Sequence, residues 1–413
     1  MAVAPARPTD VPFIDMQDYA FRANPFPTYA QLRRTAPLAR AKFAMVGPGW
    51  VLTRYDDIVA ALKDPRFSND SGVAAAGTGP SPRWLPRVFR TLQNSMITTD
   101  DPEHARLRNL VHQAFTPRRI QALSARIETI VAELLDEAAR RRQVDLVADF
   151  ALPLPLIVIS EMLGVPPKDR LQFHKWTGAF LEASSSGLFQ LLSQLPNGAR
   201  LLRFFEDLIR LRRADPQDDL ITALVNAEED GKRLSEDELV SMIFLLLLAG
   251  HETTVNLIAN GALALMEQPD QLARLHAEPQ LIDSAVEELL RFGNPVEHGN
   301  MRYLREPVEL HGTRLPAGSM VVLMLAAANR DETIFPDPDR LDIARTPNRH
   351  LAFGLGVHYC LGAPLARLEG RVALQALTQR FPHLHLAVKP EALRWRIAIA
   401  IHGLKALPVT LAG

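Results

Sequence analysis

The chain has 413 residues, 47% of them hydrophobic, and its 46 basic residues nearly balance its 47 acidic ones. A net charge near zero gives no electrostatic reason to expect nucleic acid or an acidic membrane surface as a partner. The only cysteine, Cys360, excludes an intrachain disulfide and fits a reducing cytoplasm.

No signal peptide or linker is evident. The N-terminal stretch is rich in proline and lacks an apolar core, and the longest apolar run, 242–249, is well short of the roughly 20 residues that cross a membrane. We therefore expect a cytoplasmic protein with one domain over residues 1–413, without a fused reductase and without a membrane contact.

Most of the chain has helical composition, and short strands are predicted near both ends. A helix is expected at Tyr29–Arg34. Two segments rich in small residues and proline, Asn69–Pro82 and Ser184–Gly198, predict irregular loops of the kind that often act as lids. The β-rich portions are predicted at 38–55 and 296–325, with a hairpin near the C-terminus; their clearest segments are Trp50–Thr53, Val308–Gly312 and Met320–Leu325.

The strongest helix signal begins at Ser235, which forms a Ser-x-x-Glu capping box with Glu238. The helix is expected to run to Glu267, just before Pro269. About 30 residues at 1.5 Å each give a length of ~45 Å, enough to cross a whole domain.

The middle of this helix departs from good helix design. Gly250 costs about 1 kcal/mol relative to alanine, and Glu252 follows an apolar run, where its charge loses solvation. Two such costs in one turn, Ala249 to Thr253, indicate a functional segment. The alternative is a helix that emerges from the core into solvent.

Cys360 lies at the end of a loop shaped by glycine. Gly354, Gly356 and Gly362 bracket it, and helical composition resumes at Ala363. Backbone N–H groups at a helix start favour a thiolate over a thiol. The loop therefore predicts an anionic sulfur presented to a large, flat group.

The pattern Phe353-Gly354-x-Gly356-x-His358-x-Cys360-x-Gly362 resembles the cysteine-ligand loop of the cytochromes P450. The resemblance covers essentially the whole chain. It implies the P450 fold, mainly α with a smaller β-rich lobe, in which haem b lies between the long helix and the Cys360 loop. Cys360 would be the axial ligand of the haem iron.

Ala249-Gly250-x-Glu252-Thr253 resembles the oxygen-activation motif of that family. The resemblance implies that Thr253 hydrogen-bonds the oxygen, that Glu252 relays protons, and that Ala249 and Gly250 leave room for O2. The implied reaction inserts one oxygen atom of O2 into a C–H or C=C bond of a hydrophobic molecule: a secondary metabolite, fatty acid, terpene or steroid.

Two further residue sets follow from the resemblance. One binds the haem propionates; the other is a buried charge network that fixes the Cys360 loop. Arginine suits the propionate role because its planar fork matches a carboxylate. The first set is His104, Arg108, Arg302 and His358, and the second is Glu288, Arg291 and Arg340.

The substrate pocket is less legible, because core packing explains each candidate equally well. Together the candidates suggest a roomy, apolar cavity. They are Met96, Ile97, Ile243, Phe244, Leu247, Val296, His298 and Ile399.

Partners are also implied by the family. Electrons from NAD(P)H would arrive through a separate ferredoxin-type protein that docks near Cys360 on a monomeric enzyme. A docking patch or an ordinary solvated surface would each account for Arg106, Arg118, Arg119, Arg367 and Arg371.

Two other functions stay open. One is a haem-binding sensor or carrier without oxygen chemistry, against which the Glu252–Thr253 pair speaks. The other is a hydrolase with Cys360 as nucleophile and His358 as base, although no orienting acid is evident.

Overall fold

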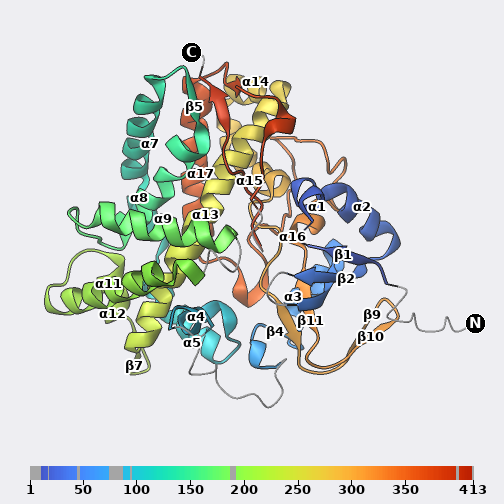
Figure 1. The fold of residues 1–413 in the computed structure, drawn as a ribbon, viewed down its shortest axis with the longest axis horizontal. Coiled ribbons are helices and arrows are strands. Elements are labelled where there is room, and N and C mark those ends of the chain that lie inside the picture. The colour runs from blue at the N-terminus through green and yellow to red at the C-terminus, as the bar shows by residue number, and fades with distance from the viewer. Residues whose placement is uncertain are drawn as a thin grey trace, which may run out of the picture.

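The computed structural model describes residues 11–16, 18–43, 47–73, 87–93, 95–186, 192–396 and 400–411. Helices fill one side of the molecule, and the largest sheet lies at the other (Figure 1). The helices are α1 (Tyr19–Ala23), α2 (Phe26–Thr35), α3 (Tyr55–Lys63), α4 (Arg87–Gln93), α5 (Glu103–Ala114), α6 (Pro117–Ala122), α7 (Ser124–Ala139), α8 (Pro153–Met162), α9 (Arg170–Ser186), α11 (Leu195–Ala214), α12 (Leu220–Asn226), α13 (Glu236–Glu267), α14 (Pro269–Ala277), α15 (Ile282–Gly293), α16 (Leu325–Ala328) and α17 (Ala363–Arg380).

In the described part of the chain the strands form one large sheet and three small ones. The large sheet has the order β1-β2-β3-β11-β8-β4, with β2 antiparallel to β3 and β11 parallel to β3. The strands are β1 (Phe13–Asp15), β2 (Leu38–Phe43), β3 (Gly47–Leu52), β4 (Phe67–Ser68), β5 (Gln143–Asp145), β6 (Glu228–Glu229), β7 (Lys232–Arg233), β8 (Arg302–Leu304), β9 (Val308–Leu310), β10 (Thr313–Leu315), β11 (Met320–Leu323), β12 (His385–Leu386) and β13 (Pro408–Thr410). Both predicted β-rich portions are confirmed.

Helix α13 is the axis of the helical side and starts where the capping box predicts. Ser235 is its N-cap, and the Ser235 backbone N–H donates to Glu238 at 2.7 Å. The helix is long and apolar enough to cross a membrane by length and composition, but 67% of its most apolar window is buried inside the protein. It packs against α8, α15 and α17, so it is a core helix.

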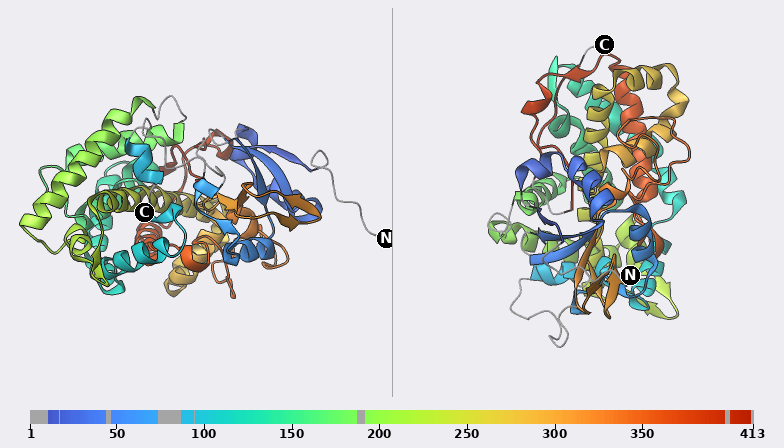
Figure 2. Two further views of the ribbon diagram at one scale, coloured as in Figure 1. Left: turned by 90° about the horizontal axis from the view of Figure 1, so that it is seen from below. Right: turned by 90° about the vertical axis from the view of Figure 1, so that its right-hand side faces the viewer.

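The two ends of the chain are joined to distant segments. Strand β13 pairs with β12 and with β5, so the C-terminal residues lie beside the end of α7. Strand β1 forms one edge of the large sheet, and the left view of Figure 2 places this sheet to one side of the helices.

The prediction of an irregular loop at Ser184–Gly198 is wrong in its described parts. Helix α9 continues to Ser186, and α11 begins at Leu195 with Pro196 in its first turn. Proline is tolerated there because the first helical N–H groups have no partner within the helix. Of the other predicted loop, the described residues include a short 3-10 turn at Ser71–Val73, and 74–82 lie outside the described residues.

Candidate active site

One cavity of about 400 Å³ lies between the middle of α13 and the Cys360 loop. Its walls are mostly apolar and come from segments far apart in sequence. The α13 residues on it are Leu245, Leu246, Ala249, Gly250, Thr253, Thr254 and Leu257, and the loop residues are Ala352, Phe353, Gly354, Leu355, His358, Tyr359, Cys360, Leu361 and Gly362.

The backbone of the Cys360 loop is set by glycine. Gly354 and Gly356 have φ of +69° and +78°, values at which a Cβ atom strains the chain. The Cys360 N–H donates to the Phe353 carbonyl at 2.9 Å and closes the loop. Helix α17 then starts at Ala363. The loop thus presents the Cys360 sulfur to the cavity.

The Cys360 thiol faces two opposing effects. Burial raises its pKa, whereas the backbone N–H groups of Gly362 and Ala363 and the charges of Arg108 and Arg367 lower it. A bound metal cation would favour the thiolate further. His358 does not hydrogen-bond Cys360 among the described residues; its Nε2 lies 2.7 Å from Asn69 Nδ2. The arrangement is therefore that of a ligand sulfur and not of a nucleophile with its base.

On the opposite wall, α13 stays helical through its Ala249–Thr253 turn. The Thr253 hydroxyl donates to the Ala249 carbonyl at 2.8 Å, and the space beside the Gly250 Cα is open. Glu252 points elsewhere: it does not line the cavity and forms an ion pair with Arg396 at 3.3 Å. Burial raises the pKa of Glu252, and Arg396 opposes that rise.

The cavity also gathers the four predicted carboxylate-binding side chains, His104, Arg108, Arg302 and His358. Arg302 is buried, and its Nε has no hydrogen-bond partner among the described residues. Neither arginine has a carboxylate within ion-pair distance in the described part of the chain. Burial lowers the pKa of Arg302 to about 10, which leaves the side chain charged at neutral pH.

A buried, unpaired guanidinium is costly, so this site fits a ligand that brings its own carboxylates. A sulfur ligand, two arginines without a carboxylate partner among the described residues, and apolar walls together match haem b with its two propionates. Sequence reasoning missed Asn69, which lines the same cavity and contacts His358.

The buried charge network differs from its prediction in one member. Arg291 and Glu288 are both fully buried and paired at 2.8 Å, as expected. The second arginine on Glu288 is Arg345, with Nε 3.1 Å from Oε1. Arg340 is exposed and contributes only its backbone carbonyl, which accepts from Arg291 and Arg345. The chain turns back after Arg340, and this turn brings Arg345 inward.

The predicted pocket residues divide into two groups. Met96, Ile97, Val296 and His298 line the cavity. Ile243, Phe244 and Leu247 do not; each is completely buried in the helical core. The face of α13 that carries Ala249 and Thr253 continues three and four residues earlier, to Leu246 and Leu245.

The C-terminal part of the pocket is formed by residues beside the predicted one. Ile399 lies outside the described residues, whereas Ala400 and Ile401 line the cavity. Leu62 and Leu325 also line it and were not predicted.

The predicted arginine patch is largely engaged in ion pairs. Arg106 binds Glu103 and Glu238, Arg119 lies 3.2 Å from Asp218, and Arg371 lies 3.8 Å from Asp283. Arg118 is exposed.

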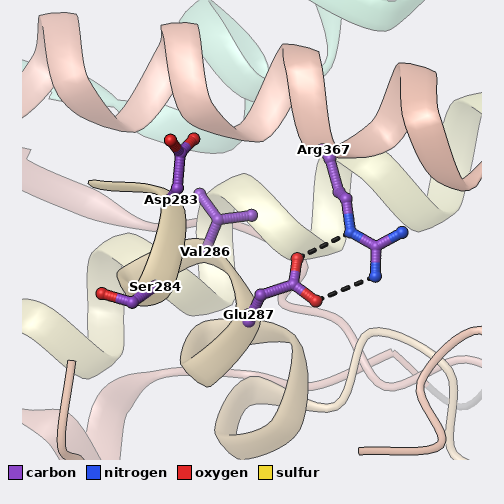
Figure 3. Close-up of a pocket in the computed structure, with 5 residues that line it drawn as sticks. All are labelled: Asp283, Ser284, Val286, Glu287 and Arg367. Carbon is purple, nitrogen blue, oxygen red and sulfur yellow. Dashed lines mark hydrogen bonds and ion pairs between the residues drawn. The ribbon is translucent and has the colours of Figure 1, made fainter. Parts of the chain in front are cut away.

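The fifth arginine of the predicted patch, Arg367, lines a small cleft between α15 and α17 (Figure 3). The Arg367 guanidinium donates two hydrogen bonds to the Glu287 carboxylate, at 2.6 and 2.8 Å. Burial alone would raise the pKa of Glu287, but hydrogen bonds from Arg367 and His350 lower it to about 2. Arg367 also donates to the Tyr359 hydroxyl at 3.1 Å, next to Cys360.

Comparison with known proteins agrees with this geometry. The family model described as "Cytochrome P450" matches residues 68–402. The cytochrome P450 monooxygenase PikC of Streptomyces venezuelae is 46% identical over 396 residues, covering 95% of this chain and 92% of PikC. The 6-deoxyerythronolide B hydroxylase of Saccharopolyspora erythraea is 42% identical over 411 residues, covering 98% of this chain and all of the hydroxylase.

The fold agrees with a solved structure as well. The bacillaene polyketide synthase cytochrome P450 PksS of Bacillus subtilis 168 superimposes with a TM-score of 0.89 at 42% identity. The match covers 96% of this chain and 99% of that one.

Proposed function

The chain belongs to the cytochrome P450 family and is a haem-thiolate monooxygenase, and we propose that it oxidises medium-to-large hydrophobic products of secondary metabolism. The relatives support this class, since one is a 6-deoxyerythronolide B hydroxylase and another a polyketide synthase P450. The proposed reaction places one atom of O2 in a C–H or C=C bond and reduces the other to water with two electrons from NAD(P)H. We propose that residues 1–413 form a single cytochrome P450 domain.

The single observation that carries the proposal is the shared cavity. The Cys360 sulfur and the Ala249–Thr253 face of α13 open into the same space. Bound haem b supplies the redox chemistry that activates O2. His104, Arg108, Arg302 and His358 would hold its propionates, and the Cys360 sulfur would ligate its iron.

The residues of α13 provide space and protons on the other side. Gly250 leaves room that a larger side chain would fill, because among the described residues no atom outside its own helical turn lies within 4 Å of the position that a Cβ would take. The Thr253 hydroxyl, now bonded to the Ala249 carbonyl, can turn to hydrogen-bond an oxygen atom. Glu252 is the adjacent acid that would deliver protons to the Thr253 side of the cavity.

The apolar walls bind the substrate and exclude water from the reacting bond. Met96, Val296 and Ile401 contribute to them together with Leu245 and Leu246 of α13. Apolar side chains make up most of the cavity lining, so a hydrophobic molecule is the expected ligand.

A separate redox partner supplies the electrons, and we propose a ferredoxin-type protein that docks over Cys360 in the cytoplasm. The turn before Cys360 reaches the surface, where 56% of Val357 and 37% of Tyr359 are exposed. Two arginines flank this turn, since Arg108 donates to the Tyr359 carbonyl and Arg367 to its hydroxyl. Arg367 is paired with Glu287 but its side chain stays 36% exposed, and a cation beside an apolar surface suits an acidic partner.

The docking proposal has its own test. Arg367→Glu is expected to slow reduction by an acidic ferredoxin and to weaken its salt dependence. Arg210→Glu, an exposed position on α11, is the matched control. Equal reduction rates and equal salt dependence in both variants would exclude docking at Arg367.

The reduced carbon-monoxide difference spectrum tests the haem-thiolate assignment. The wild-type protein is expected to give the strongly red-shifted Soret band of a thiolate ligand, and Cys360→His to give a band at shorter wavelength. Absence of haem from the purified, haem-supplemented protein would refute the assignment. Screening macrolides, fatty acids and steroids by spin-state shift then identifies the substrate class.

A further inference from the structure

Glu252 is held by an arginine from a distant part of the chain. Arg396 Nη1 lies 3.3 Å from Glu252 Oε1. The Glu252 side chain is 7% exposed and that of Arg396 is 19% exposed, so the pair lies at the edge of the interior and retains some contact with solvent. A buried carboxylate depends strongly on such a partner.

The segment that carries Arg396 is fixed to α13 close to Glu252. The Arg396 N–H donates to the Gly403 carbonyl at 2.8 Å, and Trp395 forms a β-bridge with Leu404. Gly403 lies so near α13 that a Cβ there would meet Asn256 Oδ1 at 2.1 Å. Asn256 is one helical turn after Glu252, so the contact of Gly403 with the Asn256 side chain, together with the Arg396–Gly403 backbone hydrogen bond, sets the position of Arg396 relative to this acid.

The same segment also forms part of the cavity wall. Ala400 and Ile401 line the cavity, and Ile401 is bridged to Val296 on the neighbouring wall. Arg22 on α1 donates to the Ile401 carbonyl at 3.0 Å. The described residues are therefore supported separately: Arg396 through Gly403 beside α13, and Ile401 by Arg22 on α1 and by Val296 at the cavity.

Two imidazoles, those of His251 and His174, are the other titratable groups near this pair in the described part of the chain. His251, next to Glu252 on α13, is buried; burial and then the Arg396 charge lower its pKa to about 4. His174 on α9 acts on His251, and burial lowers its pKa too. At neutral pH both imidazoles are neutral, so Arg396 is the cation that stabilises the Glu252 carboxylate.

We propose that Arg396 is a positioning residue for the proton-delivering acid: it holds Glu252 outside the cavity and ties that carboxylate to the segment whose Ala400 and Ile401 form the cavity wall. The inference rests on the proposed monooxygenase function. On this proposal the position of the Glu252 carboxylate is set by Arg396 as well as by α13.

The test is the titration of Glu252 in the haem-loaded protein, read from the carboxylic C=O stretch that Glu252→Gln removes from the infrared spectrum. Arg396→Gln is expected to raise the midpoint of this band by at least one pH unit, because it removes the charge that opposes burial. Arg396→Lys should keep the midpoint near the wild-type value. Arg394→Gln, an exposed position two residues earlier, is the matched control and should not move it.

An unchanged Glu252 titration in Arg396→Gln would overturn the proposal, as would an equal shift in Arg394→Gln. If Arg396→Gln alone does not fold, the double variant with Glu252→Gln decides, because it leaves no buried unpaired charge. The proposal expects the double variant to recover most of the loss in Tm, and no recovery would contradict it.

A failure of the proposed monooxygenase function can be distinguished from a failure of the Arg396 proposal. Its failure appears in the carbon-monoxide spectrum of the wild type, whereas the infrared titration reports the Arg396–Glu252 pair whether or not the thiolate band forms. With the thiolate band intact, Arg396→Gln should also shift the pH profile of NADPH oxidation, and Arg396→Lys should restore it.

Discussion

Arg291 and Glu288 form a two-pronged ion pair three residues apart on α15, and neither side chain is exposed to solvent. Arg345 adds a second guanidinium to the same carboxylate, and the Asp342 N–H donates to it at 3.0 Å. A buried carboxylate with this many donors is stable only while its partners remain. The network thereby joins α15 to the irregular segment that leads to the Cys360 loop.

The first prediction separates Arg345 from Arg340. Arg345→Gln removes from Glu288 a cation whose side chain is 9% exposed, and it is expected to cost about 3 kcal/mol in the free energy of unfolding, with loss of bound haem. Arg340→Gln changes an exposed side chain and is expected to stay within about 0.5 kcal/mol. Urea unfolding and haem content of the two purified variants measure both effects. A larger loss of stability and haem in Arg340→Gln than in Arg345→Gln would show that Arg340, the residue predicted from the sequence, is the second arginine of the network.

The second prediction concerns two helical glycines with opposite surroundings. Gly250→Ala meets no atom within 4 Å and should stabilise α13 by about 0.5–1 kcal/mol, while its methyl group slows carbon-monoxide binding to the reduced haem. Gly370→Ala on α17 would place its Cβ 2.7 Å from Leu257 Cδ2, and overpacking is expected to cost about 1–3 kcal/mol. Thermal unfolding and flash photolysis compare the pair. Destabilisation by Gly250→Ala would show that the space beside α13 is not open.

The third prediction is a pH dependence from Glu369 on α17. Burial raises its pKa from 4.5 to about 8, and Thr254 opposes this through a hydrogen bond. Below pH 4.5 the acid is neutral in both the folded and the unfolded chain. Between pH 4.5 and about 8 only the unfolded chain ionises, so stability falls as pH rises, by at most about 1.4 kcal/mol per pH unit.

Glu369→Gln should therefore unfold with a flatter pH profile between these limits and be more stable than wild type at pH 8. Thermal unfolding at intervals of half a pH unit checks this. Glu391→Gln, at an exposed position, serves as control and should retain the wild-type slope. Parallel profiles for wild type and Glu369→Gln would mean that Glu369 is ionised in the folded protein.

The fourth prediction tests which face of α13 lines the cavity. Leu246→Ala is expected to change the affinity for hydrophobic ligands, measured by spin-state titration with testosterone and myristic acid, at a modest cost in stability. Leu247→Ala removes a completely buried side chain and should cost about 2–5 kcal/mol with little change in ligand affinity. A change in ligand affinity in Leu247→Ala but not in Leu246→Ala would show that the face predicted from the sequence lines the cavity.

Sequence reasoning succeeded where function is encoded in contiguous residues. The Cys360 loop, the capping box at Ser235 and the Ala249–Thr253 turn each depend on local backbone demands, namely positive φ, unpaired N–H groups and missing side-chain volume. These demands leave a readable pattern within ten residues. The structure reproduces all three.

The failures have a different physical origin. Arg340 and Arg345 lie in one irregular segment, and only the path of the backbone decides which side chain turns inward. The cavity face of α13 was misassigned by about one residue, which rotates a helix by roughly 100°. Arg396, Ala400 and Ile401 reach the site through tertiary contacts with residues more than a hundred positions away, which no local pattern records.

The wall contributed by Ala400 and Ile401 also bears on how the enzyme is made. Synthesis runs from the N-terminus, so α13 and the Cys360 loop emerge from the ribosome before the segment that closes the cavity and before β13 can join β5. The wall formed by Ala400 and Ile401 is therefore complete only after synthesis has ended, and these last residues must pair with segments made more than a hundred residues earlier before the cavity is closed.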